Sequence, residues 1–346
     1  MAGGGRVVHG RTGGIILSGG SFRRGNRDCR DGAVRSGRAV FAETEEVQGV
    51  REAVVKHVVS GIPAVVCLLL ACATPPAGKV VVVATIPDLA DWARNVGGDR
   101  VEVVSLLKGG EDPHQYEPKP ADALALARAR VLVEVGLGLE EWLAGLIENA
   151  GSPKLLRVAA ADGVEVVYDA HEDEEHHSHR HGNPHVWLDP AVARATVLRL
   201  AEALALVDTT GRSYYQLRAQ DYVRQLDSAT VILQEVARQA ANRRFVAGHE
   251  SWPYFCRRFG FETVATIEPL PGQEPSAKHM AGLARRMKAE GIGSVVVEPQ
   301  SPREVAEALA RATGARVVVL STTTGGIEAA GTYLELLDYN VRALAR

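Results

Sequence analysis

The stretch from Gly211 to Ala240 constrains the fold of this chain most, because one continuous apolar stripe runs along it. The stripe consists of residues spaced alternately by four and three positions: Tyr215, Ala219, Tyr222, Leu226, Ala229, Leu233, Val236 and Ala240. Residues at this spacing share one face of an α-helix, and such a face ordinarily packs against a core. A helix of about thirty residues would be about 45 Å long. A rod of that length exceeds one lobe, so we predict a rigid helix that links two lobes.

Apolar β-branched runs alternate with helical patterns on both sides of this stretch. Before it we predict strands at 79–85, 101–107 and 131–135 and helices at 87–96, 121–129, 139–150 and 190–206. After it we predict strands at 244–247, 262–267, 293–298 and 316–320 and helices at 252–259, 277–290, 304–313 and 331–344. Such alternation is typical of α/β folds. We expect two lobes, each with a mainly parallel sheet, flanking helices and its own core: 79–207 and 242–346, joined by a linking helix at 208–241.

The front of the chain has the pattern of a secretory signal. A short apolar run at 58–71 follows the basic residues Arg51 and Lys56, and it is too short to span a bilayer comfortably. The run ends in Leu69-Leu70-Ala71-Cys72, which resembles a bacterial lipobox and implies cleavage before Cys72 and a diacylglycerol on its sulfur. An ordinary signal peptide with a chance cysteine is the alternative.

The Gly- and Arg-rich residues upstream are an unusual place for a leader to begin. We interpret 1–71 as a mis-called extension followed by the signal peptide, with the true start near Val50 or Val54. A genuine disordered N-terminal extension is the alternative. Residues 72–78, rich in Pro, Ala and Gly, are predicted to be a tether.

Charge and cysteine content exclude several classes of protein. Residues 1–57 carry a net charge of +4 out of a total of −3, which leaves −7 for residues 58–346. A mildly acidic body argues against nucleic acid as a partner and suits a protein that handles cations. The four cysteines, Cys29, Cys67, Cys72 and Cys256, fit neither a zinc knuckle nor a disulfide framework. If the chain is cut before Cys72, a disulfide between Cys72 and Cys256 stays open as an option.

Three histidines stand in short, separate contexts. His114 lies in Asp-Pro-His-Gln-Tyr-Glu-Pro, His185 in Asn-Pro-His-Val-Trp-Leu-Asp-Pro, and His249 in Ala-Gly-His-Glu-Ser-Trp. Imidazole is the commonest protein ligand for zinc and similar metals. His114 and His249 each follow a predicted strand, at the sheet edge where α/β folds bind ligands, and His185 precedes a predicted helix. We therefore expect the three to meet across a cleft as a metal site, although each alone could be an ordinary surface histidine.

Several stretches, in order and at sensible spacing from about Lys79 to Arg346, carry a family resemblance. They are Gly97-Gly98-Asp99, Asp112-Pro113-His114 through Glu117-Pro118, Gly136-Leu137-Gly138-Leu139-Glu140, Asn183-Pro184-His185 through Asp189-Pro190, and Tyr333 with Asn340. The chain resembles the zinc/manganese/iron solute-binding proteins of bacterial ABC importers, the cluster A-I or cluster 9 family.

The resemblance implies two lobes tied by a rigid helix, with His114, His185 and His249 as ligands to a metal held between them. It also implies capture of the ion outside the cytoplasm, in the periplasm or at the cell surface, and delivery to a membrane permease with its ATPase. We expect a monomer held at the membrane by a lipid anchor, with no enzymatic activity. Manganese-type relatives have a carboxylate where this chain has His249, so three imidazoles favour Zn²⁺ over manganese or iron.

A histidine-rich segment precedes His185. Residues 171–181 contain four acidic residues and five histidines: His171, His176, His177, His179 and His181. Zinc-type relatives carry a His- and acid-rich loop here, so we expect an accessory, weak metal-collecting loop. A plain solvated polar loop is the alternative.

The fourth ligand is not evident from the sequence. Relatives often supply an aspartate from the last loop, but residues 321–326 hold no carboxylate. We expect Glu298, Glu328 or water in that position, with Glu298 preferred because it ends a predicted strand.

Two other classes of protein are weaker interpretations. Three protein ligands with an open fourth position also describe a catalytic zinc site. The chain has no His-Glu-x-x-His motif, however, and Glu250 is the one simple candidate for a general base. A purely structural surface lipoprotein or adhesin would bind no metal tightly.

Overall fold

The computed structural model describes residues 78–168, 182–268 and 273–346, which belong to one compact unit. The predictions about the extension, the signal peptide, Cys72 and the segment 171–181 therefore fall outside the described residues. In the described part, no helix combines the length and the apolar character needed to cross a membrane.

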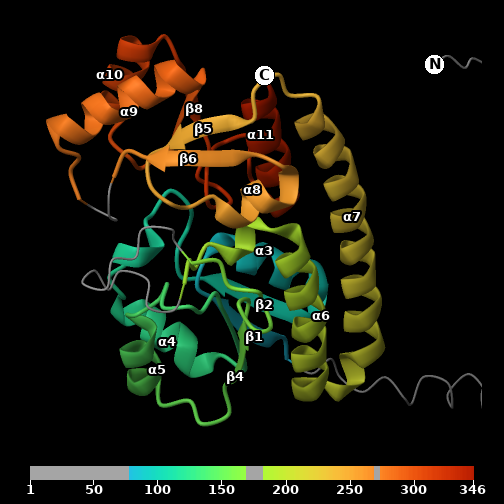
Figure 1. The fold of residues 1–346 in the computed structure, drawn as a ribbon. Coiled ribbons are helices and arrows are strands. Elements are labelled where there is room, and N and C mark those ends of the chain that lie inside the picture. The colour runs from blue at the N-terminus through green and yellow to red at the C-terminus, as the bar shows by residue number, and fades with distance from the viewer. Residues whose placement is uncertain (1–77, 169–181, 269–272) are drawn as a thin grey trace, which may run out of the picture. The chain divides into compact units, whose positions relative to one another are not determined.

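The first lobe is built on a parallel four-stranded sheet (Figure 1). Its strand order is β2-β1-β3-β4, from β1 (Val80–Ala84), β2 (Val101–Ser105), β3 (Val131–Glu134) and β4 (Leu156–Ala159). Its helices are α3 (Pro87–Gly97), α4 (Pro120–Arg128), α5 (Leu143–Ala150) and α6 (Pro190–Val207). β1 and β3 are almost wholly buried, as expected for apolar strands covered on both faces.

Two details of this lobe differ from the sequence-based prediction. β4 was not expected, because it is only four residues long and includes the charged Arg157. The α5 helix begins at Leu143 rather than Leu139, because the chain first makes a turn with positive φ at Gly136, Leu137 and Gly138. The buried carboxylate of Glu140 holds that turn by accepting hydrogen bonds from the backbone N–H groups of Val135, at 2.7 Å, and Gly136, at 3.0 Å.

The second lobe repeats the arrangement of the first. Its sheet is parallel with the order β6-β5-β7-β8, from β5 (Arg244–Ala247), β6 (Glu262–Thr266), β7 (Ser294–Val297) and β8 (Arg316–Val319). Its helices are α8 (Pro253–Phe259), α9 (Ala277–Glu290), α10 (Arg303–Thr313) and α11 (Tyr333–Ala345). The predicted fold class, two α/β lobes with parallel sheets, is confirmed.

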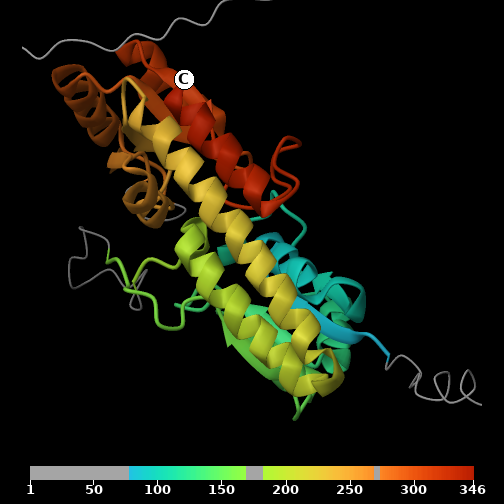
Figure 2. The same cartoon turned by 90° about the vertical axis from the view of Figure 1, so that its right-hand side faces the viewer.

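The predicted linking helix is α7 (Arg212–Arg238), which has 27 residues and is therefore about 40 Å long. It packs against α3 and α6 of the first lobe and α11 of the second (Figure 2). Five of the eight residues of the predicted stripe are buried: Tyr215, Ala219, Tyr222, Leu226 and Leu233. At the end of the stripe Ala237 is buried and Val236 only half-buried. An α-helix has 3.6 residues per turn, so residues that repeat strictly every seven positions gradually rotate away from the buried face.

The core differs from the expectation of one separate core in each lobe. One continuous cluster of buried apolar side chains includes residues of both sheets and of α3, α7, α8 and α11. Trp92 of α3 and Tyr333 of α11 meet within it edge to face, with ring centroids 5.1 Å apart. A second, smaller cluster lies where β7 meets α9 and α10, around Leu283, Val295 and Leu309. The shared core stabilises one relative placement of the lobes.

Candidate metal centre

The three predicted histidines lie together. Each offers a ring nitrogen, and these nitrogens are all within 4.8 Å of one another. The Nε2 atoms of His114 and His185 are 3.4 Å apart. The ring of His249 lies 5.5 Å from that of His185 and 6.5 Å from that of His114, measured between centroids. Loops from both lobes therefore supply the imidazoles.

His114 is held by the loop that follows β2. It lies in a short 3-10 turn, Pro113–Gln115, in which the Asp112 carboxylate accepts a hydrogen bond from the His114 backbone N–H at 2.9 Å. Trp142 donates its indole N–H to the Pro113 carbonyl at 3.0 Å, which ties the turn to the chain just before α5. The proline-bracketed motif of the sequence thus forms a turn that is capped by Asp112 and held by the hydrogen bond from Trp142.

His185 is 2 % exposed and its ring has a defined orientation. The side-chain oxygen of Asn183 lies 3.1 Å from the His185 backbone N and 3.0 Å from ring Nδ1. When Nδ1 donates to this oxygen, Nε2 keeps its lone pair and faces His114. Asn183 also donates to the Glu250 carbonyl at 2.6 Å, so one amide joins the His185 loop to the residue after His249.

His249 follows β5 and lies beside the buried carboxylate of Glu298, which follows β7. Glu298 Oε1 is 3.2 Å from His249 Nδ1 and accepts a hydrogen bond from Ser251 Oγ at 2.7 Å. Its other oxygen accepts hydrogen bonds from Gln300, at 2.6 Å, and Thr322, at 3.3 Å. A carboxylate that contacts one ring nitrogen fixes the orientation of the ring and raises the basicity of the other nitrogen.

The two glutamates predicted as fourth ligands occupy different places. Among the described residues, the His, Cys, Asp and Glu side chains gathered at the site are the three histidines alone. Glu298, 3 % exposed, contacts the His249 ring but lies outside that group. Glu328 is exposed in the loop before α11.

Two loops meet backbone to backbone beside the site. Gly109, in the loop after β2, has φ of 94°, and a Cβ there would come within 2.5 Å of the Thr324 carbonyl oxygen. The close approach therefore requires glycine at this position. Residues 321–324 are buried, and Trp187 donates its indole N–H to the Thr322 carbonyl at 2.7 Å. The loop in which relatives often carry an aspartate packs against the first lobe in this protein.

A serine beside His249 forms a geometry that also occurs in hydrolases. Ser251 Oγ lies 2.6 Å from His249 Nε2, and Glu298 lies at the other ring nitrogen, in the order nucleophile, base and acid. Ser251, however, is 0 % exposed and its hydroxyl donates to Glu298. A fully enclosed hydroxyl has no space for a substrate carbonyl, so this arrangement favours a positioning role.

The disulfide between Cys72 and Cys256 that the sequence leaves open is not tested, because Cys72 lies outside the described residues. Cys256 is a buried free thiol in α8, 3.6 Å from Thr263 Oγ1. Burial raises the pKa of this thiol to about 12, so it stays protonated and unreactive at neutral pH.

Asn183, Ser251 and Thr322 were not assigned roles from the sequence, although all three contact site residues. Asn183 did carry a signal, since it stands two positions before His185 in the motif that points to the family. Ser251 and Thr322 carried none, because their contacts with Glu298 depend on how β5, β7 and β8 lie side by side.

The chain is similar to known zinc-uptake proteins. The family model described as "Zinc-uptake complex component A periplasmic" (ZnuA) matches residues 82–346. A putative metal-binding protein of Treponema pallidum is 28% identical over 84% of this chain and 95% of its own length. The high-affinity zinc uptake system protein ZnuA of Bacillus subtilis is 25% identical over 71% of this chain and 79% of its own length. A crystal structure of ZnuA superposes with a TM-score of 0.69 at 26% identity, covering 77% of this chain and 98% of that one.

Proposed function

Because the chain belongs to the periplasmic zinc-uptake component A (ZnuA) family, we propose that His114, His185 and His249 are the ligands of its zinc ion. As a member of that family it is the extracytoplasmic zinc-binding component of an ABC importer. The single observation that carries the assignment of residues is the convergence of the three ring nitrogens within 4.8 Å.

The spacing of the nitrogens suits zinc. Two nitrogens at about 2.0–2.1 Å from a tetrahedral ion lie roughly 3.4 Å apart. His114 and His185 have that separation, 3.4 Å between their Nε2 atoms. His249 then completes the set with a small movement of its ring or loop. In the part of the chain that the structure describes, three imidazoles gather without a carboxylate, which also favours zinc over manganese or iron, since these prefer harder oxygen ligands.

We assign the fourth coordination position to water and a positioning role to Glu298. Glu298 contacts His249 Nδ1 and Ser251 Oγ lies 2.6 Å from Nε2, so a metal bound by this ring would replace one of these two contacts. A water ligand exchanges readily, which suits a carrier that must release its ion. The family transports solutes, and the enclosed Ser251 gives no support to the hydrolase alternative.

Further proposals concern attachment and partners. The Leu69-Leu70-Ala71-Cys72 run supports a lipid anchor on Cys72. The protein would then act as a monomer outside the cytoplasm and hand zinc to a permease driven by its ATPase. The segment 171–181 would serve as an accessory collecting loop.

The test is zinc calorimetry on three single variants: His114→Ala, His185→Ala and His249→Ala. Loss of an orienting residue typically costs 10–100-fold in metal affinity, so loss of a ligand should cost more than about 100-fold. His279→Ala is the matched control, because His279 lies in α9 with Nε2 3.0 Å from the Thr266 carbonyl and belongs to no metal cluster of the described residues. Near-wild-type affinity in any ligand variant would remove that residue from the site.

A further inference from the structure

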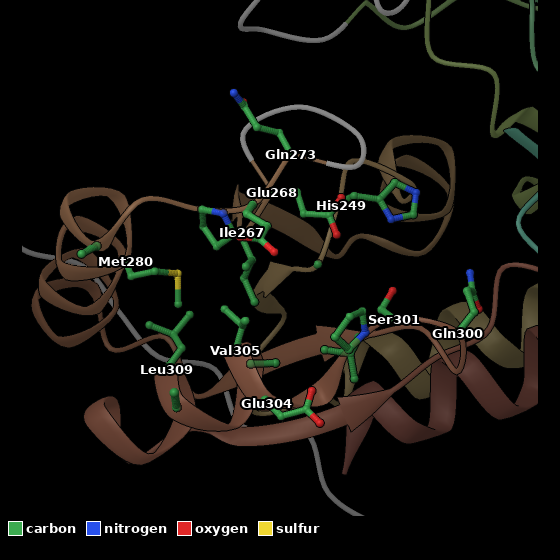
Figure 3. A pocket seen from close by; sticks show the side chains of 18 of the residues that line it. His249, Ile267, Glu268, Gln273, Met280, Gln300, Ser301, Glu304, Val305 and Leu309 are labelled. Atoms are coloured by element: carbon green, nitrogen blue, oxygen red, sulfur yellow. The ribbon is translucent and has the colours of Figure 1, made fainter. Parts of the chain in front are cut away.

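A large cavity adjoins the histidine cluster on the second-lobe side. Its volume is about 1380 Å³, and its lining includes His114 and His249. The rest of its wall comes mainly from α9, α10 and the ends of β6 and β7. Figure 3 shows Met280, Val305 and Leu309 gathered near Ile267, with His249 at the other end of the cavity. One continuous space therefore reaches from an apolar wall to the metal cluster.

The cavity is much larger than a metal ion needs. Organic ligands of drug size occupy pockets of about 300–1,000 Å³ with apolar walls and a few polar groups. This cavity exceeds that range and follows the same pattern, with apolar residues from two helices and polar groups such as Gln300 and Ser301 near the histidines. A bare zinc ion with three imidazoles and one water would leave the α9–α10 wall without a role.

Charge restricts what the cavity can hold. Four carboxylate residues line it, Asp112, Glu268, Glu274 and Glu304, and the described lining residues include no lysine or arginine. Like charges repel, so these carboxylates disfavour an anionic ligand relative to a neutral or cationic one. Met280 contributes a polarizable sulfur, which makes favourable contacts with aromatic rings.

We propose that the cavity receives the organic part of a zinc chelate: a small, neutral or cationic aromatic molecule with nitrogen donors. The zinc ion of that complex contacts the histidine cluster, where zinc can accept further ligands by exchanging water or becoming five-coordinate. The aromatic body lies between α9 and α10. This inference rests on the proposed zinc site and extends its substrate from the free ion to a chelate.

The experiment is equilibrium dialysis with zinc and phenanthroline in equal amounts, with both components measured on the protein. We expect one of each bound per chain, and phenanthroline binding at least about tenfold weaker when zinc is withheld. A sulfonated, anionic phenanthroline should bind with zinc at least about tenfold less tightly. Equal binding of the two chelators would overturn the assignment of ligand charge.

Matched tryptophan substitutions test the location. Ala284→Trp fills the α9 side of the cavity and should weaken the ternary complex at least about tenfold, with affinity for free zinc within about twofold of wild type. Ala289→Trp, on α9 but outside the lining, should change neither affinity. Ala308→Trp reaches the cavity from α10 and should weaken the ternary complex as much as Ala284→Trp does. An unchanged affinity of this variant for free zinc verifies that its metal site is folded.

The outcomes separate this inference from the proposed function. If the wild type binds no free zinc, the proposed zinc site itself fails. If it binds zinc but phenanthroline only strips the ion away, or if Ala284→Trp and Ala308→Trp retain the ternary complex, the chelate proposal alone is overturned.

Discussion

The carboxylate of Asp88, in the first turn of α3, accepts hydrogen bonds from both the backbone N–H and the hydroxyl of Thr324 in the second lobe. The hydroxyl contact is 2.8 Å long, and Asp88 is completely buried. Thr322, two residues earlier, donates to Glu298, which contacts His249. A first-lobe carboxylate thus holds the loop that supports the second-lobe histidine.

Asp88 should make the stability of the fold depend on pH. Burial is the main cause that raises the pKa of its carboxyl from 3.8 to about 7, against the lowering effect of the hydrogen bonds from Thr324. The folded state therefore retains this proton at pH values where the unfolded chain has lost it. The contribution of Asp88 to the free energy of unfolding must fall as pH rises from about 4 to about 7, by at most about 1.4 kcal/mol per pH unit.

Asp88→Asn should flatten that dependence. Urea unfolding of zinc-free protein at about pH 5 and about pH 7 measures it, since the wild type should lose more stability between the two than the variant. Asp99→Asn, at an exposed position just after α3, is the control and should behave as wild type. An equal loss of unfolding free energy between the two pH values in wild type and Asp88→Asn would contradict the prediction.

Glu298→Gln should weaken zinc binding about 10–100-fold, because the amide cannot polarise the His249 ring as a carboxylate does. Calorimetry measures the affinity. The same substitution at the exposed Glu328 should leave the affinity within about twofold of wild type. Unchanged binding in Glu298→Gln would remove the positioning role of this residue.

Deleting residues 171–181 should reduce the number of weakly bound zinc ions and leave tight binding nearly intact. The irregular spacing of its histidines and acids does not define a preformed set of ligands, so its ions should be held loosely. Titration with a zinc indicator counts both classes of bound ion. Loss of the tight class would transfer the primary site to this loop.

Cys72→Ser should block lipidation and the cleavage that depends on it, because the serine hydroxyl cannot replace the thiol as the acceptor of diacylglycerol. Metabolic labelling with a fatty acid and fractionation of membranes measure both effects. A variant that is labelled, cleaved and fractionated like the wild type would rule out the lipid anchor.

The sequence by itself predicted the fold class and predicted that His114, His185 and His249 lie together. Buried parallel strands such as β1 are runs of valine, and the stripe of α7 repeats over seven turns of helix, so local pattern and tertiary role agree in these elements. The sequence analysis did not predict β4, because its four residues include the charged Arg157, which interrupts the apolar pattern of the strand. Arg157 pairs with Glu134 of the neighbouring strand.

The tertiary structure alone decided how the site is supported. His114, His185 and His249 are recognisable because each lies in a short motif, but the contacts of Glu298 with His249 and Thr322 join three loops that are distant in the chain. The core shared by both lobes and the cavity between α9 and α10 likewise depend on how elements pack. Periodicity determines which face of a helix is apolar, whereas only packing determines whether that face meets a core or borders an open cavity.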